Sequence, residues 1–215
     1  MLNFDYLKNL NEKQLEAVSY LEGPLLIVAG AGSGKTKVLT SRIIHILKQK
    51  KAFPNQILAV TFTNKAAKEM LNRVSLSLKG GSKGFPWLGT FHSISAKILR
   101  KHAMAAGLNS RFTIIDQDDQ VRLIKNICKS EDIDIKKISP NFILSIIDKW
   151  KNKGWYPSDV ILKKKETLEK GFLKIYSIYQ KKLTDLNACD FSDLILHCVK
   201  IFEKNKDICE MYSRN

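Results

Sequence analysis

The sequence predicts an α/β domain with a parallel sheet, followed by an all-helical subdomain. Apolar runs alternate with helical patterns in the first half of the chain, which is typical of right-handed βαβ units. A glycine-rich turn lies between the first apolar run and the first helical pattern. From Asp116 onward the pattern is almost entirely helical, so we expect a subdomain boundary near this residue.

The apolar runs are expected to form the strands. They lie at Leu25–Ala29, Ile57–Phe62, Trp87–Phe91 and Phe112–Ile115. The first two are unbroken, as expected of parallel strands that are covered on both faces. Helices are expected between the strands at residues 35–48, 66–78 and 93–102, and glycines predict a loop at Lys79–Gly84.

Capping residues mark the helices of the second half. Asp116 and Asp190 can each cap a helix, and Ser139 stands before a proline that suits a first turn. The last of these helices is expected to bury Leu194, Cys198, Val199 and Phe202. Among Lys149, Lys151 and Lys153 lie the aromatic residues Trp150, Trp155 and Tyr156. This aromatic group could grip a nucleic-acid duplex or anchor the turn between two helices.

Charge is unevenly distributed along the 215 residues. The formal net charge is +15, with 36 Lys and Arg against 21 Asp and Glu. Between Gly23 and Arg111 a single acidic residue, Glu69, stands against 15 basic ones. Charge this local suggests a polyanionic partner for the first half, although a solvated lysine surface is the alternative.

Several classes of protein are disfavoured. No apolar run approaches the ~18 residues of a membrane span, and the first residues lack the pattern of a signal peptide. The four cysteines show no CxxC pairing, so we expect free thiols in a reducing cytoplasm and no zinc site.

A phosphate-binding loop is expected between the first strand and the first helix. It consists of Ala29, Gly30, Ala31, Gly32, Ser33, Gly34, Lys35 and Thr36. The glycines let backbone N–H groups converge on phosphate oxygens, and the helix N-terminus adds partial positive charge. Lys35 is expected to reach the β and γ phosphates, and the Thr36 hydroxyl to hold Mg²⁺. The pattern indicates a nucleoside triphosphate without saying which one.

Gln14 is a candidate for reading the base. Its carboxamide offers one donor and one acceptor, which match the exocyclic amine and a ring nitrogen of adenine. Asn11 and Gln14 also fit a helix capping box, and the residues alone favour neither reading.

Four segments occur in order and at close spacing, namely LNEKQLEAV, LLIVAGAGSGKT, ILAVTFTNKAAKEM and LGTFHSISAKILR. They resemble the Q motif and motifs I, Ia and Ib of superfamily 1 DNA helicases of the UvrD/Rep/PcrA type. Three later stretches, FTIIDQDDQVRLIK, IYSIYQKKL and DFSDLIL, resemble those that lead through that family's helical insertion. The resemblance covers nearly the whole chain.

The resemblance implies a RecA-like P-loop NTPase fold. Residues 1–115 would be the ATP-binding domain, residues 116–205 the helical insertion, and residues 206–215 the start of the return to the first domain. It also implies translocation along single-stranded DNA in the 3′ to 5′ direction, driven by ATP and Mg²⁺, with unwinding at junctions of single and double strands. The pathway stays open, whether repair, replication restart or plasmid replication.

The resemblance implies roles for the residues that match the family's motifs by position. Gln14 would read adenine, residues 29–36 would hold the phosphates and Mg²⁺, and Lys37 and Arg73 would lie near the nucleotide. Lys37 stands where many relatives have Arg. Phe62 would stack on a base, although a core aromatic is the alternative. The DNA path would further be lined by Thr63, Asn64, Thr90 and His92; for His92, a buried structural histidine is the alternative.

The resemblance also implies parts that this sequence does not contain. The acidic motif that completes the Mg²⁺ site would follow Asn215 by a few residues, and Ile115-Asp116 offers only a superficial substitute. The second motor domain would follow as a partner lobe. We therefore expect the chain alone neither to hydrolyse ATP at a useful rate nor to unwind DNA, and to expose an apolar sheet edge that favours self-association.

Three other classes remain open on the sequence. A GTPase should show NKxD, but Ala67 stands where the aspartate belongs, and a kinase should prefer a small acceptor over DNA. A non-catalytic nucleic-acid-binding module would bind single strands equally with or without ATP. A helicase–nuclease subunit of the RecB or AddA type is the alternative within the superfamily.

Overall fold

The structure is a computed structural model that describes residues 5–77, 84–133, 138–163 and 170–213. The loop expected at 79–84 lies almost entirely outside these residues. The chain divides into two compact units, one extending to Ile94 and the other beginning at Ser95. The subdomain boundary expected at residue 116 stays a prediction. Within the described ranges no helix is long and apolar enough to cross a membrane.

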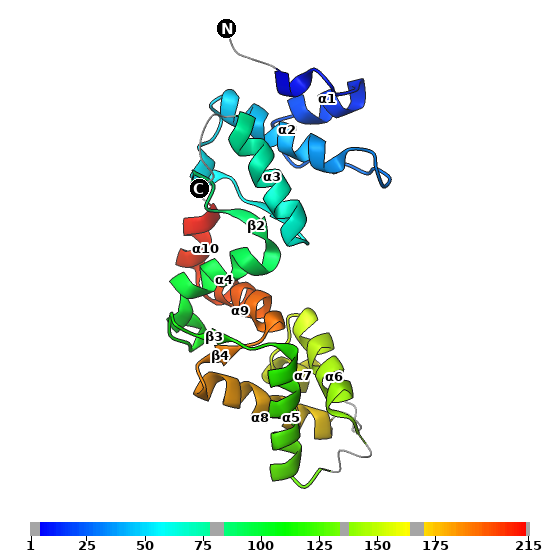
Figure 1. Cartoon of the computed structure of the whole chain (residues 1–215). Helices are drawn as coiled ribbons and strands as arrows, with labels where there is room; N and C mark the ends of the chain where they lie inside the picture. Colours follow the sequence, from blue (N-terminus) through cyan, green and yellow to red (C-terminus); the bar gives the residue numbers. More distant parts are fainter. Residues whose placement is uncertain (1–4, 78–83, 134–137, 164–169, 214–215) are drawn as a thin grey trace. The chain divides into compact units, whose positions relative to one another are not determined.

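The first unit is built on one parallel strand pair and the helices around it. Its elements are η1 (Asp5–Leu7), α1 (Glu12–Ser19), α2 (Lys35–Lys48), η2 (Pro54–Gln56), β1 (Ala59–Thr61), α3 (Asn64–Ser77) and β2 (Leu88–Thr90), followed by the start of α4 (Phe91–Lys101) (Figure 1). β1 and β2 are parallel, with Thr61 opposite Thr90. The strands expected near 57–62 and 87–91 and the helix expected at 35–48 are therefore confirmed.

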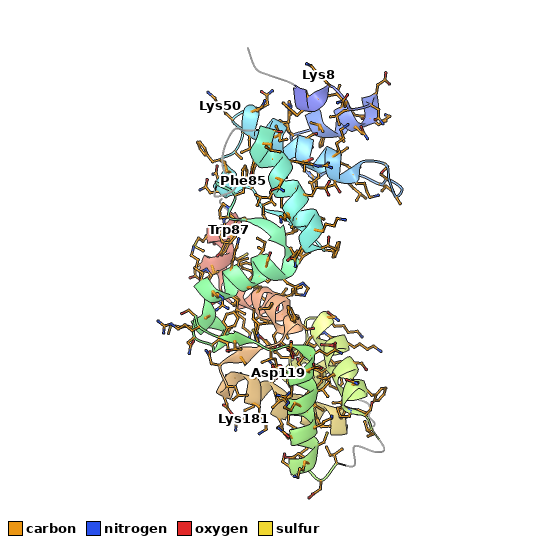
Figure 2. All side chains as sticks on the ribbon, viewed as in Figure 1. Lys8, Lys50, Phe85, Trp87, Asp119 and Lys181 are labelled. Carbon is orange, nitrogen blue, oxygen red and sulfur yellow. The ribbon has the colours of Figure 1, made fainter. Side chains whose placement is uncertain are left out.

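The core of this unit lies where α2, α3 and the strand pair meet. Apolar residues three or four apart on α3 face the strands, as Met70 and Val74 do. Ile43 and Ile44 of α2 pack into the same cluster. Phe85, labelled in Figure 2, is buried beside them just before β2. Burying these side chains fixes the strand pair against the two helices.

The strand expected at Leu25–Ala29 is not formed. This segment has no regular secondary structure, and Leu26 and Val28 are 86% and 88% exposed. A strand needs a neighbour to pair its backbone N–H and C=O groups, and no described strand runs beside this one. The apolar run therefore indicates that the segment is suited to a buried strand. It does not show that a neighbouring strand is present to pair with it.

The second unit is mainly helical. Its elements are the rest of α4, η4 (Ala103–Ala106), β3 (Thr113–Ile114), α5 (Gln117–Ser130), α6 (Pro140–Asn152), α7 (Pro157–Lys163), α8 (Lys170–Asp185), β4 (Ala188–Cys189), α9 (Phe191–Lys204) and α10 (Lys206–Ser213) (Figure 1). β3 pairs in parallel with β4, so the expected single sheet is instead two separate strand pairs. The short β4 carries only two residues, too few to show a strand pattern in the sequence.

The caps predicted at Asp116 and Asp190 are confirmed, and Ser139, expected just before the proline of a first turn, also caps its helix. Side-chain oxygens of Asp116, Ser139 and Asp190 accept hydrogen bonds from backbone N–H groups in the first turns of α5, α6 and α9. One predicted core residue is wrong, because Val199 is 39% exposed. Helical spacing explains the error: Leu194, Cys198 and Ile201 share the buried face of α9, and Val199 points away from it.

A buried ion cluster ties three helices of this unit together. The Lys151 ammonium on α6 lies 2.6 Å from a carboxylate oxygen of Asp190 and 2.7 Å from one of Asp193. The Tyr179 hydroxyl on α8 donates to Asp190 at 2.9 Å. All four side chains are buried, so their charges are screened little by water. The cluster thus joins α6 and α8 to the N-terminus of α9.

Protonation in the cluster follows from burial and neighbouring charge. Burial alone would lower the pKa of Lys151, but the carboxylates of Asp193 and Asp190 outweigh burial and raise it. Burial lowers the pKa of His197, which favours the neutral ring. Burial also raises the pKa of the neighbouring Cys189 thiol to about 12. All four cysteines are free thiols, as predicted.

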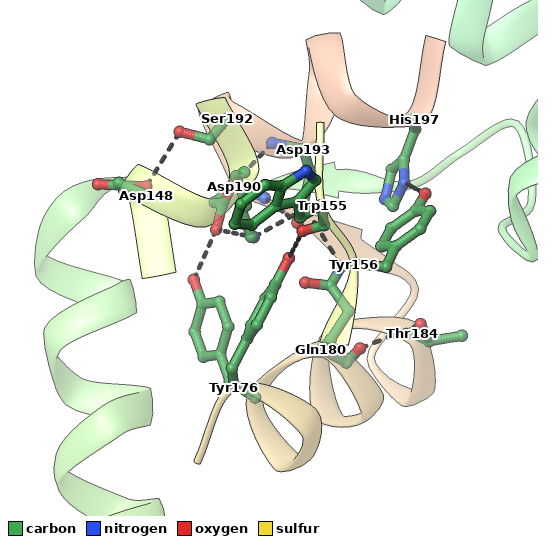
Figure 3. A network of polar contacts seen from close by, with 12 residues as sticks. Asp148, Trp155, Tyr156, Tyr176, Gln180, Thr184, Asp190, Ser192, Asp193 and His197 are labelled. Carbon is green, nitrogen blue, oxygen red and sulfur yellow. Dashed lines mark hydrogen bonds and ion pairs between the residues drawn. The ribbon is translucent and has the colours of Figure 1, made fainter. Parts of the chain in front are cut away.

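The aromatic group between α6 and α7 serves as an anchor. Trp150 is buried and its ring stacks on Tyr176, with 5.7 Å between ring centroids. The Tyr176 hydroxyl donates to the Trp155 carbonyl at 3.0 Å, and the Tyr156 hydroxyl is hydrogen-bonded to His197 (Figure 3). These contacts support the anchoring interpretation over a grip on duplex DNA.

Replacing Lys151 with methionine should lower the free energy of unfolding by about 3–5 kcal/mol, because two buried carboxylates lose their cation. Lys149→Met is the matched control, since Lys149 is exposed on the same helix. Urea unfolding followed by tryptophan fluorescence measures both. Equal stability of the two variants would contradict a structural role for the ion cluster.

Candidate functional site

The glycine-rich turn before α2 has the backbone conformation that only glycine adopts easily. Gly32 and Gly34 have φ angles of 75° and 85°, in the left-handed region. Gly34 is the residue immediately before α2, so this conformation is what turns the chain into the helix. The first N–H groups of the helix are left without partners in the helix and can face an anion.

Lys35 lies folded back over this turn. Its ammonium donates to the carbonyls of Ala29 at 2.9 Å and Gly30 at 2.5 Å. The Ser33 hydroxyl donates to the Gly30 carbonyl at 2.7 Å. Lys35 itself is exposed, so its ammonium lies at the mouth of the loop, where an oxyanion could replace the carbonyls.

Gln14 contacts the same turn from α1. Its amide group donates to the Ser33 carbonyl at 3.0 Å. Its carbonyl oxygen accepts from the Asn11 backbone N–H at 3.1 Å, and the Asn11 side chain accepts from the Gln14 N–H at 2.9 Å. The capping box is therefore present, and the same side chain also supports the loop. Both hydrogen-bonding groups that the adenine reading needs have protein partners in this structure.

A hollow of about 200 Å³ lies between α1 and the turn. It is lined by Asn11, Lys13, Gln14, Ala17, Ile27, Val28, Ala29, Ser33, Lys35 and Val38. The lining combines apolar side chains with two carboxamides and two ammonium groups. This combination suits a flat base joined to a charged tail.

Three other predicted nucleotide residues, Thr36, Lys37 and Arg73, do not line that hollow. Thr36 is exposed in the first turn of α2. The Lys37 ammonium donates to the Asn9 carbonyl, and Arg73 is paired with Glu69 on α3. Lys37 and Arg73 both line a second hollow of about 470 Å³. The structure thus brings these two cations to one surface, separate from the lining that Gln14 and Lys35 share.

The predicted nucleic-acid residues gather where β1 and β2 end. Phe62 directly follows β1 and is 88% exposed, so it is not a core aromatic. Asn64 begins α3, and the Thr63 hydroxyl oxygen accepts from the Ala66 N–H at 3.2 Å. Strand ends at one edge of a parallel sheet are where ligands commonly bind.

Thr90 and His92 behave differently from each other. Thr90 is buried, and its hydroxyl oxygen accepts from the Ser93 N–H at 3.1 Å. It therefore caps α4 and offers no exposed side chain to a ligand. His92 is exposed, so the reading as a buried histidine is wrong.

The sequence analysis did not identify two partly exposed aromatic residues that lie close to strand ends. Phe91 lies beside Phe62, with 5.4 Å between ring centroids, but the sequence suggested a strand residue there. Phe191 is also about half-exposed at the start of α9, where Asp190 alone separates it from β4. In both cases an aromatic residue follows a strand, and that position is the signal that could have found it.

Comparison with known proteins identifies the family. The family model described as the UvrD/REP helicase N-terminal domain matches residues 10–215. The chain belongs to the UvrD/REP helicase family. A probable DNA helicase II homolog of Rickettsia conorii is 47% identical over 215 residues, which are 99% of this chain and 32% of the relative. The ATP-dependent DNA helicase PcrA of Staphylococcus aureus is 43% identical over 206 residues, 96% of this chain and 28% of PcrA.

The chain therefore spans about a third of the length of these UvrD/REP relatives. The match includes the glycine-rich turn, the strand ends and the helical unit, because it runs from residue 10 to residue 215.

Gly34→Ala should destabilise the chain by about 1–2 kcal/mol, because alanine is strained at this φ angle. The new Cβ would also lie 3.0 Å from the Gln14 amide nitrogen. Gly30→Ala is the matched control, since a Cβ there meets nothing within 4 Å. Thermal unfolding by circular dichroism compares them, and equal midpoints would argue against the strained turn.

Proposed function

We propose that this chain is the ATP-binding and single-stranded-DNA-binding part of an ATP-dependent 3′–5′ DNA helicase. The observation that carries the proposal is the glycine turn before α2, with Lys35 at its mouth and Gln14 bonded to its backbone. The relatives whose names include ATP-dependent DNA helicase support the choice of ATP and of DNA.

In this proposal the loop at residues 29–36 holds the triphosphate. Lys35 exchanges its carbonyl partners for the β and γ phosphate oxygens, a stronger charge-assisted contact. The Thr36 hydroxyl would be a Mg²⁺ ligand, and the exposed position of this residue in the first turn of α2 leaves it accessible. Bound Mg²⁺ would neutralise the charge that develops on the phosphates. Gln14 reads adenine from the hollow between α1 and the loop.

DNA is proposed to lie along the edge where β1 and β2 end. The Phe62 ring offers an exposed π-face to a base, which suits binding that does not depend on sequence. Thr63, Asn64 and His92 stand around it, and Thr90 contributes by fixing the start of α4. Lysines of the first half attract the phosphate backbone.

ATP hydrolysis and DNA unwinding are proposed to need further parts of the helicase beyond these 215 residues. Asp116, the acidic residue at the end of a strand, is engaged as the cap of α5 through the Asp119 N–H at 2.9 Å. Coupling of ATP hydrolysis to translocation at junctions is therefore assigned to the longer proteins that the relatives represent. Their additional length would supply the acidic motif and the second motor lobe.

ATP binding is tested with a fluorescent ATP analogue and the 215-residue chain. Lys35→Ala should weaken binding at least tenfold, because the phosphates lose their cation. Lys48→Ala is the control, since Lys48 lies at the other end of α2. Binding that survives Lys35→Ala unchanged would refute the nucleotide site and leave a nucleic-acid-binding module as the better reading.

DNA binding is tested with an oligothymidylate by fluorescence anisotropy. Affinity should fall about tenfold or more between 50 and 200 mM salt, because counterions are released on binding. Phe62→Ala should cost about 1–3 kcal/mol if a base stacks on the ring. Phe53→Ala is the control, because Phe53 is also exposed but precedes β1. Equal affinities of the two variants would remove Phe62 from the site.

A further inference from the structure

The exposed Phe62 ring has a neighbour that the proposed function does not use. Phe91 is the first residue of α4 and directly follows β2. Because Thr61 lies opposite Thr90 in the parallel pair, the next residues, Phe62 and Phe91, leave the sheet side by side. Their ring centroids are 5.4 Å apart and their planes are inclined by 43°.

The two rings differ in what they can offer a ligand. Phe62 is 88% exposed, whereas Phe91 is 41% exposed and partly covered. Since the planes are inclined, one flat base cannot lie parallel to both rings at once. The more exposed ring is therefore the one available for stacking, and the half-buried ring supports it from the side.

The position of Phe91 is itself fixed by a network at the start of α4. The Thr90 N–H donates to the Ser93 hydroxyl at 2.9 Å, and the Ser93 hydroxyl donates to the Thr90 carbonyl at 3.0 Å. Together with the Ser93 N–H bond to Thr90, these contacts fix the backbone of the two residues between them, Phe91 and His92. Gly89 leaves room for this arrangement, because a Cβ there would lie 2.5 Å from the Ser93 oxygen.

We infer that Phe91 is a positioning residue that holds the Phe62 ring ready to stack on a base of single-stranded DNA. An exposed ring without a neighbour samples several rotamers and loses that freedom when a base binds. Contact with Phe91 restricts those rotamers before binding, so less entropy is lost. This inference rests on the proposed function, because it explains how Phe62, the residue proposed to contact DNA, is held in place.

A double-mutant cycle on the 215-residue chain tests the inference. The probe is an oligothymidylate with a single 2-aminopurine, whose fluorescence is quenched when the base stacks. Phe62→Ala should weaken binding about tenfold and relieve the quenching. Phe91→Leu should weaken binding about threefold to tenfold and relieve part of the quenching, whereas Phe91→Tyr, which keeps the ring, should stay within about twofold of the unchanged chain.

The decisive comparison is the double variant. If Phe91 acts through Phe62, adding Phe91→Leu to Phe62→Ala should cause no further loss beyond about twofold. A further loss equal to that of Phe91→Leu alone would overturn the inference, because it would mean that Phe91 contacts DNA independently. Binding of the fluorescent ATP analogue and the thermal midpoint should stay unchanged in Phe91→Tyr, and they check that each variant folds.

The test also separates this inference from the proposed function. If Phe62→Ala weakens binding but Phe91→Leu leaves affinity and quenching unchanged, only the positioning role is overturned. If Phe62→Ala itself has no effect on affinity or quenching, the DNA site of the proposed function is wrong and the positioning role falls with it.

Discussion

The register of the β1–β2 pair is the constraint on which the candidate DNA site depends. Pairing Thr61 with Thr90 ends both strands at the same level, so α3 and α4 start at one edge. Every predicted DNA residue, from Phe62 to His92, follows one of these strand ends or caps the helix after it. A slip of one residue in this pair would turn each of these side chains toward the opposite face.

Much of the local structure could be predicted because it depends on neighbouring residues. The helix at 35–48 and the caps at Asp116, Ser139 and Asp190 need only helical spacing and a short polar side chain, and all are found. The loop before α2 was identified by its glycines, and two of them have positive φ angles. Of the candidate site, the sequence and the resemblance located the loop, Gln14 and the exposed Phe62.

The features that the sequence predicted wrongly or did not reveal depend on partners that are distant in the sequence. Leu25–Ala29 has the composition of a buried strand, but composition does not provide a neighbouring strand. Lys151 stood out in the sequence only as one of the lysines around the aromatic group, because its carboxylate partners are 39 and 42 residues away. Phe91 was assigned to a strand, since nothing in its own segment shows that Phe62 ends beside it. Tertiary pairing, which a local pattern cannot encode, decides each case.

In the proposed nucleotide site, the double engagement of Gln14 would limit how strongly its carboxamide discriminates between nucleobases. Its carboxamide caps α1 and supports the loop at the same time, so contacts with a base must be made in exchange for those bonds. Each hydrogen bond given up offsets about 1 kcal/mol of whatever the base contributes. Preference for adenine over guanine should therefore be modest, and most of the affinity for a nucleotide should come from its anionic tail.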